Sequence, residues 1–90
     1  MNIKDLANSI KKVIYILEKE YASQLTSGLL ELIYKRYVNA IICITNKDLR
    51  DIKISGGVRA YLDSYSNYTC TLVIAMDEAE TLYEDILKKI

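Results

Sequence analysis

The amino-acid sequence predicts an all-α fold, a small antiparallel four-helix bundle with a short third helix, formed by residues 1–90 as a single helical domain. Apolar residues recur at spacings of three and four along four stretches of the chain, which is the period of an α-helix. The chain has no proline, so long helices stay unbroken. Its three glycines, Gly28, Gly56 and Gly57, fall between these stretches and mark the predicted boundaries.

The first helix is predicted from Ile3 to Gln24. It has the clearest amphipathic pattern in the chain, and its apolar face consists of Ile3, Leu6, Ile10, Val13, Leu17 and Tyr21. Asn2 can cap this helix, and Asp5 falls in the first turn, where the helix dipole favours a carboxylate. The break that follows, residues 26–28, is short enough to fold the next helix back antiparallel.

The second helix is predicted over residues 29–44, with Ser27 or Thr26 as its N-cap and Glu31 in its first turn. Its main apolar stripe consists of Leu29, Leu30, Ile33, Tyr37, Ile41 and Ile44. A second stripe consists of Leu32, Tyr34, Val38 and Ile42. An apolar arc this wide is typical of a helix that is contacted on two sides, so we expect the other segments to pack around this one.

A polar link, residues 46–55, follows a turn-like sequence at 46–48. Leu49, Ile52 and Ile54 are expected to hold the link against the core. The sequence Ser55-Gly56-Gly57 resembles a phosphate-binding loop only in its glycines, because the lysine and the spacing of a P-loop are missing. We therefore expect Ser55 to be the N-cap of the short third helix, Val58–Tyr65.

The last helix is predicted over residues 68–90. Its apolar stripe consists of Leu72, Met76, Ala79, Tyr83, Ile86 and Ile90. A competing signal is Asp77-x-x-Glu80, which resembles the capping box at a helix start. If the helix begins there, the fold becomes α+β, with a small sheet formed by residues 40–45, 50–54 and 68–75. Because the apolar spacing continues across Asp77, the sequence favours one long helix.

Charge and composition exclude several classes of partner. The chain has twelve basic and twelve acidic side chains, so no net field attracts nucleic acid or an anionic membrane. Four cations form a basic patch only if the first two helices align suitably, namely Lys11, Lys12, Lys35 and Arg36. The sequence therefore favours a protein partner over a nucleic acid. The most apolar run is interrupted by charges and shorter than the roughly 20 residues of a membrane span. With no signal-peptide pattern at the start of the chain, we expect a cytoplasmic location.

The residues needed for common catalytic and metal sites are missing. There is no histidine, which excludes the Ser-His and Cys-His nucleophile systems. Cys43 and Cys70 lie far apart in the sequence and are expected to be buried thiols in a reducing compartment. The carboxylates Asp77, Glu80 and Glu84 are expected to be solvated on a helix face. We therefore predict that the protein is not an enzyme and binds no cofactor and no metal.

The best candidate for a binding surface consists of Arg59, Tyr61, Tyr65 and Tyr68. Spacings of three and four align the tyrosines along one side if the third helix extends that far. Tyrosine and arginine are enriched at protein-binding hot spots, so Tyr65 is the predicted anchor and Arg59 the charged contact. The alternative is that these tyrosines edge the core, since the chain has no phenylalanine or tryptophan to do so.

These observations predict a non-catalytic, protein-binding module. The order and size of its helices resemble the small bacterial immunity bundles for pediocin-type bacteriocins, which implies an immunity- or inhibitor-like role. The resemblance covers architecture alone, and it carries no functional residue to this chain. One alternative is a self-associating structural or regulatory helical protein of bacterial or mobile-element origin, a homodimer for example, with excess apolar surface of the central helix buried between copies. A second alternative is a nucleic-acid-binding regulator.

Overall fold

The computed structural model describes residues 3–25, 28–65 and 70–89, with the side chains of residues 24, 64 and 65 left out. Within these ranges the chain forms four α-helices: α1 (Ile3–Glu20), α2 (Leu29–Thr45), α3 (Gly57–Tyr65) and α4 (Thr71–Lys89). Two short 3-10 helices, η1 (Ala22–Gln24) and η2 (Leu49–Asp51), follow α1 and α2. The all-α bundle with a short third helix is thus confirmed.

The described part of the chain contains no strand, so the α+β alternative is wrong there. Residues 40–45 continue α2, and residues 71–75 open α4. Residues 50–54 complete η2 and then run without a strand partner. The β-branched side chains at 41, 42 and 44 therefore follow the helical spacing of α2 rather than their own preference for strands.

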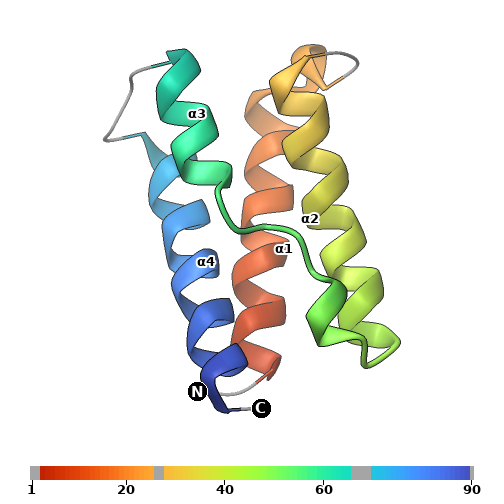
Figure 1. Ribbon diagram of the computed structural model, residues 1–90. Coiled ribbons are helices and arrows are strands. Elements are labelled where there is room, and N and C mark those ends of the chain that lie inside the picture. Colours follow the sequence, from red (N-terminus) through yellow and green to blue (C-terminus); the bar gives the residue numbers. More distant parts are fainter. Residues whose placement is uncertain (1–2, 26–27, 66–69, 90) are drawn as a thin grey trace.

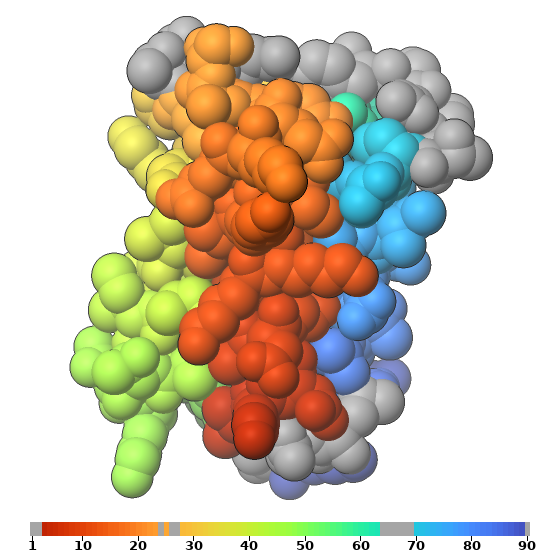
Figure 2. All heavy atoms as spheres, turned by 180° about the vertical axis from the view of Figure 1, so that it is seen from behind, coloured from red at the N-terminus to blue at the C-terminus, as the bar shows by residue number. Residues whose placement is uncertain are grey.

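The three long helices lie side by side, with α1 in the middle. Figure 1 shows α4 and α2 on opposite sides of α1, and the view from behind in Figure 2 shows the same order. Since α1 runs antiparallel to both neighbours, α2 and α4 point in the same direction along opposite edges of the bundle. The short α3 packs against α4 and also contacts α2.

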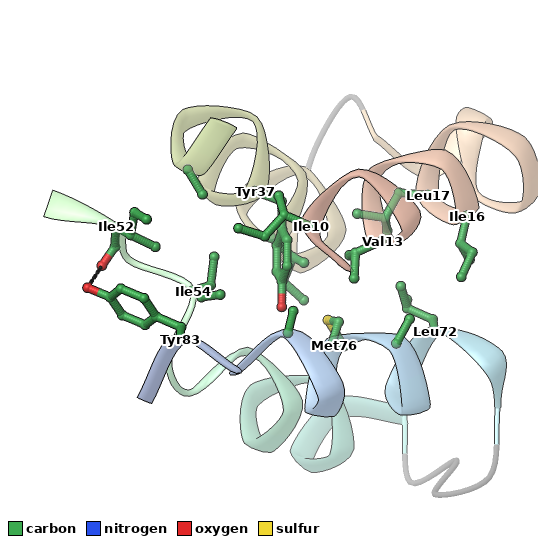
Figure 3. Packing of buried hydrophobic residues seen from close by; sticks show 14 of the residues in the cluster. Ile10, Val13, Ile16, Leu17, Tyr37, Ile52, Ile54, Leu72, Met76 and Tyr83 are labelled. Atoms are coloured by element: carbon green, nitrogen blue, oxygen red, sulfur yellow. Dashed lines mark hydrogen bonds between the residues drawn. The ribbon is translucent and has the colours of Figure 1, made fainter. Parts of the chain in front are cut away.

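The most extensive packing joins α1 to α4. In α1, the side chains of Leu6, Ile10, Val13 and Leu17 are fully buried. Facing them are the buried side chains of α4, among them Leu72, Met76 and Ala79; Figure 3 shows Val13 and Ile16 opposite Leu72. Each such aliphatic side chain contributes about 1.5–3 kcal/mol when buried. The predicted face is correct except at its start, because Ile3 is 44 % exposed.

The helix that follows the first break begins directly after a glycine. The residue before α2 is Gly28, which makes no side-chain capping bond and has a φ of +83° that favours glycine. Thr26 and Ser27, the predicted caps, lie outside the described residues. The first helix is also shorter than predicted, because it ends at Glu20 and η1 takes up residues 22–24.

The predicted turn at 46–48 closes α2 with a Schellman motif. The Asp48 N–H donates to the Cys43 carbonyl at 2.7 Å, and the Lys47 N–H donates to the Ile44 carbonyl at 3.1 Å. This motif requires one residue in the left-handed region of backbone conformation, and Lys47 occupies that region with a φ of +61°. An L side chain is strained in this region by about 1 kcal/mol or more.

We call residues 46–56 the crossover, because they lead from the end of α2 to the α4 side of the bundle (Figure 1). Ile52 and Ile54 are 4 % and 1 % exposed, and Leu49 packs against the same core. The sequence predicted this anchoring of the link correctly. The crossover therefore closes part of the core that a longer third helix would cover in a regular four-helix bundle.

Candidate functional site

The structure does not bring the four predicted binding residues together on one surface. Arg59 is exposed on α3, as expected. Tyr61 is 3 % exposed and belongs to the core, so its predicted place on an exposed patch is wrong. The side chain of Tyr65 and the whole of Tyr68 lie outside the described residues, so their predicted role stays a prediction.

The burial of Tyr61 has a local cause. Helix α3 is short, and the face that carries Tyr61 is the one turned to the core. The Cys70 thiol points at the Tyr61 hydroxyl, with Sγ and Oη 3.7 Å apart. Burial first, and then hydrogen bonds with Tyr21 and Cys70, raise the pKa of Tyr61. Tyr61 thus takes the structural role that the sequence left open as the alternative.

A different exposed surface lies on α2. We call it the α2 stripe, and it consists of Leu32, Lys35, Asn39 and Ile42, all exposed. Spacings of three, four and three place these side chains on one face of the helix. Leu32 is 46 % exposed and Ile42 is 52 % exposed. The remaining members of the predicted second stripe, Tyr34 and Val38, are half-buried.

A small apolar hollow adjoins this stripe on the α3 side. Leu32 and Arg36 of α2 line it together with Ile54, Gly57 and Ala60. Its volume is about 30 Å³, which is room for about one water molecule. The hollow is thus a feature of the surface rather than a pocket for a metabolite.

The glycine loop at the start of α3 does bind a carboxylate, but the carboxylate belongs to the chain itself. The Gly56 N–H donates to Glu80 Oε1 and the Val58 N–H donates to Glu80 Oε2, both at 2.9 Å. Glu80 of α4 therefore caps α3, and Ser55, the predicted N-cap, is exposed. The prediction that Asp77, Glu80 and Glu84 are solvated fails at Glu80, which is half-buried, and holds for the exposed Asp77 and Glu84.

Opposing effects act on the Glu80 carboxyl. Burial raises its pKa, while the two backbone N–H donors lower it; the charges of Glu84 and Asp77 raise it further. The net result is a pKa above the ordinary value of 4.5. Because both carboxylate oxygens already accept backbone hydrogen bonds, Glu80 serves the fold rather than a substrate.

Two further tyrosine hydroxyls lie inside the bundle. The Tyr83 hydroxyl lies 2.9 Å from the Leu49 carbonyl and 3.2 Å from the Ile52 carbonyl, to which it donates, tying α4 to the crossover (Figure 3). The Tyr37 hydroxyl is buried without a hydrogen-bond partner among the described atoms. Burial, with a smaller effect of the Glu80 charge, raises the pKa of Tyr37. Neither hydroxyl is placed to react.

Two of the four cations proposed as a basic patch line different surface hollows. Lys12 lines a shallow groove between α1 and α4, where it is accompanied by Asp5 and Glu78. Arg36 lines the small hollow between α2 and α3. The acidic side chains beside Lys12 counter its charge, and Lys12 and Arg36 do not share one basic surface.

The remaining findings concern cysteines, metals and membranes. Cys43 is buried near the end of α2, whereas Cys70 is half-buried just before α4, and both are free thiols. In the described ranges, no three side chains among His, Cys, Asp and Glu are grouped so that they could hold a metal ion. None of the helices described is long and apolar enough to cross a membrane.

Comparison with known proteins identifies a family and no activity. No curated protein matches the chain, and no solved structure does either. A protein-family model matches it over residues 1–90, which includes every helix described above. The chain therefore belongs to the family described as YeeD uncharacterised protein.

Proposed function

We propose that this chain is a non-catalytic module that recognises a protein partner through the α2 stripe. The observation that carries the proposal is the exposure of Leu32 and Ile42 on one outward helix face, with Lys35 and Asn39 between them. A single exposed leucine or isoleucine is ordinary on a protein surface. Here the two lie on the same face over about 15 Å of helix, a pattern typical of helices that dock on a partner.

The polar groups of the bundle support a binding role over a catalytic one. The Glu80 carboxylate is held by two backbone N–H groups, and the Tyr83 hydroxyl is held by two carbonyls. The Cys70 thiol faces the Tyr61 hydroxyl. These groups are thus engaged in holding the fold, and the chain has no histidine for acid–base work.

An immunity- or inhibitor-like role is the form of this proposal that the helical architecture supports. Such proteins act by occupying a surface of another protein, for which a rigid helix face is suited. A nucleic-acid partner is less well supported, because Lys12 and Arg36 line different hollows and the chain has no net charge.

Site-directed photo-crosslinking in living cells tests the proposal. A benzophenone amino acid at Asn39, in the middle of the α2 stripe, is expected to yield a covalent adduct whose mass identifies the partner. The matched control places the same group at Tyr15, which is 54 % exposed on α1. Adducts that form with the group at Asn39 and not with the group at Tyr15 support the proposal. The yield of these adducts should decrease when Lys35→Glu is introduced. No adduct from Asn39, or equal adducts from both positions, contradicts it.

A further inference from the structure

We propose that the partner of the α2 stripe is a second copy of this chain, which presents the outward face of α4. This inference rests on the proposed function, since it names the occupant of the same surface. We call the facing surface the α4 stripe, and it consists of Ile74, Asp77, Thr81 and Glu84, all exposed. Ile74 is 56 % exposed, the highest value among the large apolar side chains whose exposure is described.

The two stripes have the same spacing and complementary chemistry. In each, an apolar residue is followed at i+3 by a charge and at i+7 by a small polar side chain. When the helices lie parallel, three pairs face each other: Leu32 with Ile74, Lys35 with Asp77, and Asn39 with Thr81.

The residues that follow add charge to each edge and set the end of the match. At i+4 from the apolar residue, α2 has Arg36 and α4 has Glu78, both exposed. In a parallel contact, residues at i+4 lie on opposite flanks. Arg36 lines the hollow beside α3 and Glu78 lines the groove beside α1, so the two add charge to their own edges without facing each other. The match ends one turn later, where Ile42 falls opposite Glu84. The predicted contact is therefore about two helical turns long.

The charges of the two edges are opposite. Helix α4 carries five acidic side chains and two lysines, and its lysines are confined to the last turn. Helix α2 carries two basic side chains and one acidic one. Since the chain as a whole is neutral, like copies do not repel each other through net charge, and the edges attract.

The fold presents the two stripes in a way that lets copies join repeatedly. Helices α2 and α4 point in the same direction on opposite edges of the bundle (Figures 1 and 2). A second copy displaced sideways, without being turned over, therefore places its α4 parallel to the α2 of the first. Each added copy leaves one stripe free at either end, so this contact forms rows rather than a closed pair.

The contact is small and its charged pairs are exposed. Lys35 already lies 3.3 Å from Glu31, but its side chain is 70 % exposed and can approach a second carboxylate. Exposed ion pairs are weak and are screened by salt. A single helix-to-helix contact also buries less than the roughly 1,200 Å² of a stable interface. We therefore expect association at high protein concentration and low salt.

Sedimentation equilibrium over a wide concentration range, at low and at high salt, tests the inference. For the unaltered chain, the average mass should rise with concentration from 10.3 kDa past that of a dimer at low salt, and should fall back at high salt. Two variants reverse one edge each, Lys35→Glu with Arg36→Glu, and Asp77→Lys with Glu78→Lys. Each alone should weaken association by at least about tenfold, since like charges then face each other.

Mixing the two variants is the decisive measurement. The acidic α2 of one variant then meets the basic α4 of the other, and the unaltered edges also match, so association should return in the mixture. The control, Lys4→Glu with Lys11→Glu, makes the same change of charge at two exposed positions of α1 and should leave association in place. Circular dichroism confirms that every variant is folded.

Three results overturn the inference: a chain that stays monomeric at every concentration, a mixture that fails to associate, or association that stops at two copies. The crosslinking experiment separates this failure from that of the proposed function. If the chain is monomeric and the group at Asn39 captures a different protein, the self-association is wrong and the proposed function stands. If the chain is monomeric and Asn39 captures nothing, both are wrong.

Discussion

The seam between α1 and α4 and the crossover both bury apolar side chains, but they are held in place differently. The seam is a long row of aliphatic contacts, in which each helix supplies a residue at every turn. The crossover buries Ile52 and Ile54 and is otherwise fixed by two polar side chains of α4, Tyr83 and Glu80. The seam is thus stabilised by many similar contacts, while the crossover depends on a few specific ones.

The largest effect is expected in the seam. Leu17 is fully buried, so Leu17→Ala leaves a cavity and should lower the free energy of unfolding by about 2–5 kcal/mol. Urea denaturation followed by circular dichroism measures this loss. The exposed Ile42 offers the control, because Ile42→Ala should change stability by less than about 0.5 kcal/mol. A loss below about 1 kcal/mol for Leu17→Ala would show that the seam repacks easily.

A smaller effect is expected where α4 holds the crossover. Tyr83→Phe removes the donor to the Leu49 and Ile52 carbonyls and should lower the free energy of unfolding by about 1–2 kcal/mol. Hydrogen exchange should also become faster at amides within residues 49–54 and stay unchanged in the middle of α1. Tyr15→Phe, on an exposed tyrosine, is the matched control. Uniformly faster exchange along the chain would mean that the crossover does not open by itself.

The second anchor has an effect that depends on pH. Glu80→Gln has one acceptor oxygen and one donor, as the protonated carboxyl group has, so we expect the two free energies of unfolding to agree within about 0.5 kcal/mol at pH 4. The folded chain raises the pKa of Glu80 above 4.5, so it binds the proton more tightly than the unfolded chain does. The resulting stability is fully present below about pH 4.5 and is lost as the pH rises through the raised pKa.

Unfolding free energies of both proteins at pH 4 and pH 7 check this sign. The unaltered chain should lose stability relative to Glu80→Gln between pH 4 and pH 7. Removing a neighbouring charge with Glu84→Gln lowers the pKa of Glu80, so this loss should be smaller in that background. A gain in stability relative to Glu80→Gln as the pH rises would mean that the two N–H donors outweigh burial and the acidic neighbours.

The smallest effect is a gain in stability at the start of the crossover. Lys47 holds a φ of +61°, so Lys47→Gly relieves strain and should raise the free energy of unfolding by about 0.5 kcal/mol after the entropy cost of glycine. Asn46→Gly is the control at the neighbouring residue, whose φ is −88°, and should destabilise. Thermal unfolding distinguishes the expected stabilisation by Lys47→Gly from the expected destabilisation by Asn46→Gly. A destabilised Lys47→Gly would show that the lysine side chain contributes more than its strain.

The same contrast explains what the sequence could predict about the fold. The positions of all four helices follow from spacings of three and four, because such spacing is local to each helix. The residue that caps α3 could not be predicted from the local sequence. Ser55 is beside the helix start, but Glu80, which lies 22 to 24 residues from its two donors, takes that place through the packing of α4 against α3. Capping by a distant side chain leaves no local pattern.

The candidate binding surface was predictable only in part. The wide apolar arc of the second helix signalled a surplus of apolar surface, and the structure leaves Leu32 and Ile42 exposed. The prediction of an exposed tyrosine patch was wrong at Tyr61. Spacing places residues on one side of a helix, but it does not show whether that side faces the core or the solvent. For a nine-residue helix, the packing of its neighbours settles that question.

The pairing of α1 with α4 bears on how the molecule is made. Residues 21–70 separate the two helices, so the largest interface of the bundle joins segments that are synthesised far apart in time. A chain emerging from the ribosome can fold α1 back on α2 early, but the other flank of α1 stays uncovered until α4 is available. During that interval the apolar side chains of a nascent α1 are accessible to chaperones. The rate of translation through the last helix sets the duration of this exposure.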